Sequence, residues 1–391
     1  MPQSNNVLNV EDSVRNRYSS GARERQEDLC CPTSYDPRYL AAIPREVLER
    51  DYGCGDPSRH LRQGETVLDL GSGTGKICFI ASQVVGLQGK VIGIDMNDEM
   101  LGLARRSAPI VAERVGYANV EFRKAKIQDL ALDLERLELW LNEHPVRTST
   151  DLAELEAFTA EMKRARPLMK DNSVDVVVSN CVLNLVRSED KRRLFAEIFR
   201  VLRRGGRAVI SDITCDEMVP AHLQNDSELW SGCISGALRE DEFLKAFEEA
   251  GFYGISVLER QTKPWRTVEG FEFRSMTVVA YKGKEGHCWD HKQAVIYKGP
   301  FKQVVDDDGH VLPRGARVAV CEKTFNIYSR EPYRSQFEFI EPVAKPSPEE
   351  VRPFPCAKGT LLRHPRETKG DDYRLTSEPS TSVCGPEGGC C

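Results

Sequence analysis

The sequence predicts an α/β fold in which a parallel sheet carries helices on both faces. Short runs rich in β-branched residues alternate with helical segments between residues 65 and 212, and this alternation is typical of a parallel sheet. A glycine-rich loop, Gly71-Ser-Gly-Thr-Gly75, follows the first run and opens a helix. From about residue 286 apolar and polar residues alternate instead, which predicts a second, small β-rich domain.

The elements of the first domain can be followed along the chain. We expect five buried strands at Thr66–Leu70, Lys90–Asp95, Asn119–Arg123, Val174–Ser179 and Arg207–Asp212. Helices are expected at Lys76–Val85, Met100–Val115 and Ser188–Leu202, and a helical stretch at about 217–250. Two further strands are expected at Ile255–Arg260 and Ser275–Tyr281.

An insertion and two flanking segments complete the organisation. Leucines at helical spacing, interrupted by His144-Pro145, predict two helices inserted within residues 133–171. They form either a lid or a structural cap, and we favour the cap. The sequence divides into an N-terminal, partly helical segment at 1–60, a main domain at 61–284 and a β-rich domain at 285–344. Residues 345–391 are rich in Pro, Ser, Glu and Gly, which predicts a mostly disordered tail ending in cysteines.

Composition excludes several classes of protein. The chain has 391 residues and a formal net charge of −6, so a broad basic surface for nucleic acid is not expected. No signal peptide or long apolar run suggests secretion or a membrane span. Thirteen cysteines are present without any Cys-x-x-Cys pair, which argues against a zinc finger. We therefore expect a cytoplasmic, monomeric protein whose thiols stay reduced.

The glycine-rich loop predicts a site for a nucleotide-type cofactor. A loop between a strand and a helix lets the backbone approach a ligand, and the helix supplies free N–H donors. Asp95 ends the second strand, where an acid is placed to accept hydrogen bonds from ribose hydroxyls. The spacing Gly-x-Gly-x-Gly differs from that of dinucleotide sites, and Asp69 precedes the loop. That carboxylate would repel a pyrophosphate but would balance a sulfonium or an amino group.

With these features the chain resembles the class I S-adenosylmethionine-dependent methyltransferases. The resemblance implies a Rossmann-like sheet of seven strands, the last one antiparallel. It implies that Asp69 and the loop residues Gly71, Ser72, Gly73 and Gly75 hold the methionine part of the cofactor. It further implies that Asp95 binds the ribose, Met96 packs on the adenine, Ile127 and Gln128 edge the base, and Asn180 lies near the sulfonium.

Three cysteines sit beside this cofactor loop in distinctive contexts. Cys54 lies between Gly53 and Gly55, and Cys233 follows Trp230 in the helical stretch. Cys181 follows the fourth strand, at the carboxyl end of the sheet where ligands of open α/β folds bind. The contexts are Tyr52-Gly-Cys-Gly55, Val178-Ser-Asn-Cys-Val-Leu-Asn-Leu185 and Gly232-Cys-Ile-Ser-Gly-Ala-Leu238.

Together with the glycine loop and Gly93-Ile-Asp-Met96, these motifs resemble the arsenite methyltransferases. The resemblance implies that Cys54, Cys181 and Cys233 bind As(III), which is soft and prefers thiolates. It implies methylation to mono-, di- and trimethyl products. It also implies a fourth, N-terminal cysteine, either Cys30 or Cys31, that takes part in redox cycling, with glutathione or thioredoxin resetting the enzyme. Two alternatives are a methyltransferase with an organic small-molecule acceptor and a non-catalytic thiolate sensor of soft metals.

The remaining cysteines give weaker signals. We expect Cys78 and Cys215 to belong to the packed core. Cys288 lies in His287-Cys-Trp-Asp-His291, which we interpret as a loop rather than a metal site. Cys321, Cys356 and Cys384 have no informative context. The terminal pair Cys390-Cys391 either scavenges arsenic or has no function, and the sequence does not distinguish the two.

Overall fold

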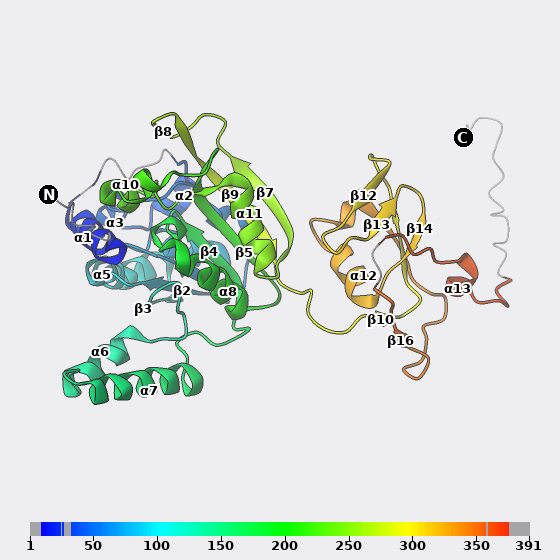
Figure 1. Ribbon diagram of the computed structural model, residues 1–391, viewed down its shortest axis with the longest axis horizontal. Coiled ribbons are helices and arrows are strands. Elements are labelled where there is room, and N and C mark those ends of the chain that lie inside the picture. The colour runs from blue at the N-terminus through cyan, green and yellow to red at the C-terminus, as the bar shows by residue number, and fades with distance from the viewer. Residues whose placement is uncertain (1–8, 25, 27–32, 357–358, 375–391) are drawn as a thin grey trace. The chain divides into compact units, whose positions relative to one another are not determined.

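The computed structural model describes residues 9–24, 26, 33–356 and 359–374. The chain divides into two compact units, Met1–Gly283 and Lys284–Cys391, and each is described by itself (Figure 1). In the described part of the chain, no helix combines the length and the apolar character needed to cross a membrane.

The first unit is built around one mixed sheet. Its main strands are β1 (Thr66–Leu70), β2 (Lys90–Asp95), β3 (Val120–Lys124), β4 (Val174–Asn180), β5 (Leu202–Cys215), β7 (Tyr253–Arg260) and β9 (Phe271–Tyr281). They lie in the order β3-β2-β1-β4-β5-β9-β7. The pairs from β3 to β5 are parallel, and β9 is antiparallel to both neighbours. This confirms the predicted seven-stranded sheet whose last strand is antiparallel.

Two short strands extend this sheet, and helices surround it. The short strands are β6 (Leu238–Arg239) and β8 (Arg266–Val268). The helices are α1 (Val10–Arg23), α2 (Pro37–Leu40), α3 (Arg45–Glu49), α4 (Lys76–Val85), α5 (Asp98–Val115), α6 (Leu134–Glu143), α7 (Ser149–Ala165), α8 (Lys191–Val201), α9 (Ala221–Gln224), α10 (Ser227–Ser231) and α11 (Glu240–Glu249).

Alternation along β1 shows how the sheet separates two cores. Val67 packs in an apolar cluster with side chains of α4 and α5. Leu68 and Leu70 point to the opposite face and pack in a second cluster with side chains of α8 and α11. Both faces of the strand are therefore buried, which explains why β1 reads as a nearly continuous apolar run.

The helical stretch expected at about 217–250 is interrupted, and this corrects the placement of Cys233. The chain forms the short helices α9 and α10 and then turns at Cys233, whose φ is +63°. Three residues later the backbone passes so close to Asn184 that a Cβ on Gly236 would lie 1.9 Å from the Asn184 carbonyl oxygen. Cys233 therefore lies in a turn and not in a helix. Regular helix resumes only at α11.

The predicted insertion forms a pair of helices. The N-terminus of α7 is capped by Thr148 and Asp151, which exchange hydrogen bonds with each other's backbone. The ring of Trp140 on α6 stacks between His144 and Phe158, with centroid distances of 4.5 and 4.7 Å. Figure 1 shows the pair lying apart from the sheet. No residue of α6 or α7 lines the cavity at the ends of β1, β2 and β4, and the role of the pair as a structural cap stays a prediction.

The described part of the second unit contains short strands and two α-helices. They are β10 (Trp289–Asp290), β11 (Ala294–Tyr297), β12 (Gln303–Val305), β13 (Val311–Pro313), β14 (Arg317–Ala319), α12 (Glu322–Tyr328), β15 (Phe337–Ile340), β16 (Arg352–Pro353) and α13 (Pro365–Lys369). β11 pairs with β14 and β15. The turn predicted at Asp306–Gly309 joins β12 and β13.

The sequence prediction of a disordered tail from residue 345 is wrong for the part described, up to Arg374. β16 pairs with β10, and Phe354 is buried. The Arg363 guanidinium is buried and forms an ion pair of 2.6 Å with Asp290 and one of 2.8 Å with Glu367. These contacts join residues far apart in the chain, so composition and local periodicity give no sign of them. The terminal Cys384, Cys390 and Cys391 lie outside the described residues.

Candidate active site

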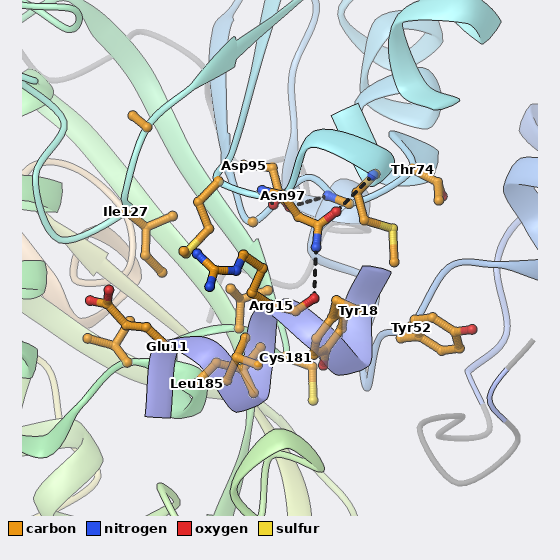
Figure 2. Close-up of a pocket in the computed structure, with 18 of the residues that line it drawn as sticks. Glu11, Arg15, Tyr18, Tyr52, Thr74, Asp95, Asn97, Ile127, Cys181 and Leu185 are labelled. Carbon is orange, nitrogen blue, oxygen red and sulfur yellow. Dashed lines mark hydrogen bonds between the residues drawn. The ribbon is translucent and has the colours of Figure 1, made fainter. Parts of the chain in front are cut away.

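A cavity of about 920 Å³, counting space open to solvent, lies where β1, β2 and β4 end. Figure 2 shows α1 crossing this cavity, with Asp95 and Asn97 facing it. The predicted site residues that line it are Gly71, Gly73, Asp95, Met96, Ile127, Gln128 and Cys181. Those that do not are Asp69, Ser72, Gly75, Asn180, Cys54 and Cys233. Cys30 and Cys31 lie outside the described residues.

The glycine loop forms one wall of the cavity. Gly73 has φ +52°, and a Cβ built on it meets no atom within 4 Å, so its backbone is open to a ligand. A Cβ on Gly71 would instead lie 2.3 Å from Val182. The Asp95 carboxylate accepts hydrogen bonds of 2.9 Å from the backbone N–H groups of Gly73 and Asn97. Asp95 therefore fixes the loop as well as presenting an acid to the cavity.

Asp69 lies behind the loop and not on the cavity wall. Its carboxylate is buried and accepts a 3.2 Å hydrogen bond from the thiol of Cys78 on α4. Burial raises the pKa of Asp69 to about 7, although the hydrogen bond from Cys78 opposes this shift. Asp69 therefore does not line the cavity, and its role in holding the methionine part of the cofactor stays a prediction. Cys78 is a buried core residue, as the sequence indicated.

Besides Asp95, a second aspartate lines the cavity, Asp51, which the sequence did not predict. Asp51 forms a buried ion pair of 2.5 Å with Lys76, the first residue of α4. The Lys76 ammonium also lies 4.1 Å from the ring centroid of Tyr35. The sequence offered one indication of this role, which is that Asp51 directly precedes the Tyr52-Gly-Cys-Gly55 motif.

The N-terminal helix α1 supplies a further wall that the sequence did not predict. Glu11, Val14, Arg15 and Tyr18 line the cavity from this helix. Asn97, at the start of α5, donates hydrogen bonds to the Arg15 carbonyl at 3.1 Å and to the Ser19 hydroxyl at 3.0 Å. Arg17 donates to the Glu228 carbonyl at 2.8 Å and to the Ser231 hydroxyl at 3.1 Å. These bonds attach α1 to both sides of the cavity.

Asn180 positions the loop that carries Cys54. Its side-chain oxygen accepts hydrogen bonds from the backbone N–H of Cys54 at 2.9 Å and of Gly55 at 3.0 Å. Its amide donates to the Gly55 carbonyl at 2.8 Å and to the Tyr35 hydroxyl at 3.2 Å. A Cβ on Gly53 would lie 2.3 Å from the same amide. The structure thus places Asn180 against the cysteine loop, and the predicted position of Asn180 near the sulfonium stays a prediction.

Cys181 and Cys233 both have left-handed backbones. Their φ values are +65° and +63°, a conformation that costs energy for residues other than glycine and that concentrates at functional sites. The Cys233 thiol donates to the Cys181 carbonyl at 3.1 Å, and the Tyr18 hydroxyl lies 3.8 Å from the Cys233 sulfur. Burial raises the pKa of the Tyr18 hydroxyl.

The three predicted thiols share one buried cluster. Cys54, Cys181 and Cys233 are all reduced, and they pack together with Ile213 and Phe273. Their three sulfurs do not all lie within 4.8 Å of one another. Side-chain rotation is therefore needed before all three could bind one ion. Cys215 packs in the same cluster and is buried, as predicted.

The cavity suits S-adenosylmethionine in shape and chemistry. The open backbone at Gly73 leaves room where a side chain would otherwise intrude. Met96, Met100 and Ile127 give an apolar wall, and Asp51 and Asp95 also line the cavity. An apolar wall with a few convergent polar groups is typical of small-molecule sites.

Comparison with known proteins agrees with this geometry. A family model described as a methyltransferase domain matches residues 61–166 and 146–251, and a model described as a domain of unknown function matches residues 284–373. An arsenite methyltransferase of Aquipseudomonas alcaligenes is 32% identical over 350 residues, covering 85% of this chain and 91% of that protein. The arsenite methyltransferase of Homo sapiens is 28% identical over 368 residues, covering 90% and 86%.

A solved structure shows the same relationship. The crystal structure of an arsenic(III) S-adenosylmethionine methyltransferase from Chlamydomonas reinhardtii is 27% identical, with a TM-score of 0.53, and the match covers 79% of this chain and 96% of that one. Sequence identity over most of the chain and the shared fold lead to the same family. This chain belongs to the arsenite methyltransferase family.

Proposed function

We propose that this protein transfers methyl groups from S-adenosylmethionine to thiolate-bound As(III), giving mono-, di- and trimethylated arsenicals. The observation that carries the proposal is the position of Cys181. Cys181 lines the cofactor cavity in a strained left-handed backbone conformation. Its carbonyl accepts a hydrogen bond from the thiol of Cys233. Family membership supports the same reaction.

The cavity residues hold the methyl donor in this proposal. When bound, S-adenosylmethionine supplies a methyl group on a positively charged sulfur. Asp95 offers carboxylate oxygens to its ribose, and the backbone at Gly71 and Gly73 lets its amino-acid part approach. Met96 and Ile127 pack against the base, and Gln128 borders it. Helix α1 covers the cavity and keeps water from the transferable group.

The three cysteines bind and orient arsenic. Arsenite, As(OH)₃, exchanges its three hydroxyl groups for the sulfurs of the Cys54, Cys181 and Cys233 thiols, and the three thiol protons leave with the hydroxyl groups as three water molecules. The arsenic keeps a lone pair, and this lone pair attacks the methyl group as the bond from carbon to the donor sulfur breaks. Proximity and alignment supply the rate increase. No general base is needed, because arsenic has no proton to lose.

Each transfer leaves arsenic oxidised by two electrons. We assign its reduction to a pair of cysteines, Cys54 with Cys30 or Cys31, which supply two electrons by forming a disulfide. Glutathione or thioredoxin then reduces that disulfide by thiol exchange. This cycle requires a reducing compartment, so we place the reaction in the cytoplasm. We propose that the protein acts as a monomer.

Two other functions remain to be tested against this proposal. A methyltransferase acting on an organic acceptor would keep its activity without Cys54, Cys181 and Cys233. A non-catalytic sensor of soft metals would bind arsenite without turnover. The open cofactor cavity beside Cys181 favours an enzyme over a sensor.

The test is arsenic speciation with purified protein, arsenite, S-adenosylmethionine and glutathione. Wild type should yield methylated arsenic, and Cys181→Ser should yield none or stop after an early product. Cys215→Ser is a matched control, because it makes the same change in the same buried cluster at a residue that does not line the cavity. Wild-type protein that binds S-adenosylmethionine but produces no methylated arsenic would overturn the proposal.

A further inference from the structure

The second unit contains three cysteines that converge although they are far apart in the sequence. The sulfur atoms of Cys288, Cys321 and Cys356 all lie within 4.8 Å of one another. All three are reduced. Among the described residues, no His, Asp or Glu joins this group. The cysteines of the cofactor site do not reach this mutual proximity.

Strand pairing holds two of these cysteines in place. β10 and β16 pair so that Trp289 lies opposite Pro353, which sets Cys288 beside the chain that leads to Cys356. The Phe354 N–H donates to the Cys288 carbonyl at 2.8 Å, and the Cys356 N–H donates to the Phe354 carbonyl at 2.9 Å. The buried ion pair between Arg363 and Asp290 anchors the end of β10.

The third cysteine is held by a helix. Cys321 is the N-terminal cap of α12, and its sulfur accepts a 3.4 Å hydrogen bond from the Thr324 N–H. The Thr324 hydroxyl lies 3.3 Å from the same sulfur. The three thiols are therefore positioned by three separate pieces of backbone before any ligand arrives, which lowers the entropy cost of binding one.

The cluster is not simply part of an apolar core. Cys321 is only 1% exposed and packs with Phe354 and Ala319. Cys288 is partly exposed, and Cys356 is exposed. The group thus runs from the interior to the surface, which leaves it accessible to an ion in solution. A single disulfide cannot account for the arrangement, because it would leave one of three adjacent thiols over.

Ligand number favours a three-coordinate ion. Thiolates select soft ions, and a structural zinc site almost always has four protein ligands. Three sulfurs without a fourth described donor match trivalent arsenic, which forms three bonds and keeps a lone pair. Binding balances without any redox step: As(OH)₃ and three thiols give three As–S bonds and three water molecules.

We propose that Cys288, Cys321 and Cys356 form a second As(III) site in the unit Lys284–Cys391, separate from the cysteines of the cofactor site. The choice of arsenite as the ion rests on the proposed function, since arsenite is then the thiophilic substrate that this protein meets. The three-thiol geometry itself does not depend on that function.

The experiment counts arsenic bound to the full-length protein. Reduced protein is dialysed against arsenite without S-adenosylmethionine, and bound arsenic is measured by mass spectrometry. Cys356→Ser and Cys288→Ser should each bind one equivalent per chain less than wild type. Cys215→Ser makes the same change in the first unit and should bind as much as wild type. Cys356 is exposed, so its substitution leaves the packing of the core unchanged.

A spectroscopic measurement identifies the ligands. In a Cys181→Ser background, X-ray absorption should show three sulfur neighbours for arsenic, and this signal should disappear when Cys356→Ser is added. Equal binding by wild type and Cys356→Ser would overturn the inference. So would stoichiometric zinc or copper that arsenite fails to displace. Wild type could make no methylated arsenic while Cys356→Ser still binds one equivalent of arsenic less than wild type. In that case only the proposed function fails.

Discussion

Asn180 shows how one side chain can organise a site without facing its ligand. Its amide makes four hydrogen bonds, and three of them hold the backbone of Cys54 and Gly55. Asn180 ends β4, and the next residue is Cys181. One strand end therefore determines the positions of two of the three proposed arsenic ligands.

Substituting Asn180→Ala should impair arsenic chemistry more than cofactor binding. The N–H groups of Cys54 and Gly55 would lose their partner, and each buried unsatisfied group costs roughly 1–3 kcal/mol. We expect methylation to fall at least about tenfold, which corresponds to about 1.4 kcal/mol. The dissociation constant for S-adenosylmethionine, measured by calorimetry, should change little, because Asn180 does not line the cavity.

Asn180→Asp provides the matched control for this prediction. It keeps the oxygen that accepts from Cys54 and Gly55. It loses the two donated bonds and places a carboxylate oxygen against the Gly55 carbonyl. Its methylation rate should lie between those of wild type and Asn180→Ala. A large loss of cofactor affinity in Asn180→Ala would contradict this prediction and would support a contact between Asn180 and the cofactor.

Asp69 should make stability depend on pH. Burial raises its pKa from 3.8 to about 7 in the folded protein, so the folded state binds more protons than the unfolded state between these values. The contribution of Asp69 to the free energy of unfolding is fully present below about pH 4. It is lost as the pH rises to about 7, by at most about 1.4 kcal/mol per pH unit.

The comparison with Asp69→Asn isolates this contribution. The neutral amide cannot titrate, so its free energy of unfolding should fall less than that of wild type between pH 5 and pH 8. Denaturant titrations at both pH values measure the difference. Asp212 also has a raised pKa, about 6, because it is buried, but it is present in both proteins. Parallel pH profiles would contradict the assignment.

At the scale of residues, the sequence predicted which residues gather at the site better than which of them face the cavity. The glycine loop, Asp95 and Cys181 do line one cavity, because strand ends of a parallel sheet meet at one edge. The contacts of Asp69 and Asn180 were harder to predict, because the direction in which a side chain points at the end of a strand depends on packing. Asp51 gave no periodic signal at all.

At the scale of elements, α1 is the part that completes the cavity. It contributes four lining residues, although few of its own side chains are buried. Its attachment depends on side-chain hydrogen bonds to backbone groups of neighbouring elements. Such an element belongs to the less stable part of a fold and can open locally.

Removing one attachment should loosen α1 measurably. Arg17→Ala loses the hydrogen bonds to Glu228 and Ser231, and a bond to a charged group contributes roughly 1.5–3 kcal/mol. Amide hydrogens of α1 should therefore exchange about tenfold faster or more. Arg23→Ala serves as control, because its ion pair with Glu99 is largely exposed. Equal exchange in both variants would refute this role of Arg17.

Loosening the helix pair α6–α7, in contrast to α1, should leave the cofactor cavity unaffected. Trp140→Ala removes the stacking of Trp140 on His144 and Phe158, so the pair should lose roughly 1 kcal/mol of stability. Because neither helix lines the cavity, the affinity for S-adenosylmethionine should stay the same. Calorimetry on the variant measures both quantities, and weaker cofactor binding would favour a lid instead of a cap.

Elements were predictable where local pattern decides them. β1, β2 and α4 have the bounds that the sequence predicted, because apolar runs ending in glycine or aspartate mark them clearly. The stretch at 217–250 and the segment after residue 345 were not predictable. There, a left-handed turn at Cys233 and a buried Arg363 depend on contacts with distant residues.

At the scale of the whole molecule, each unit holds its own thiol cluster. Every residue that lines the cofactor cavity belongs to the first unit. The three converging cysteines belong to the second. The two sites can therefore be separated by shortening the chain at the boundary between Gly283 and Lys284.

A protein consisting of residues 1–283 should keep the cofactor site and lose the second arsenic site. Its dissociation constant for S-adenosylmethionine should match that of the full chain within a factor of about two, as expected for independent sites. Bound arsenite should fall by one equivalent per chain, the same loss as in Cys356→Ser. Combining the truncation with Cys181→Ser should remove a further equivalent, because the proposed ligands of the two sites do not overlap. A tenfold weaker affinity would instead show that the second unit contributes to cofactor binding. No change in bound arsenic would show that the second unit holds none.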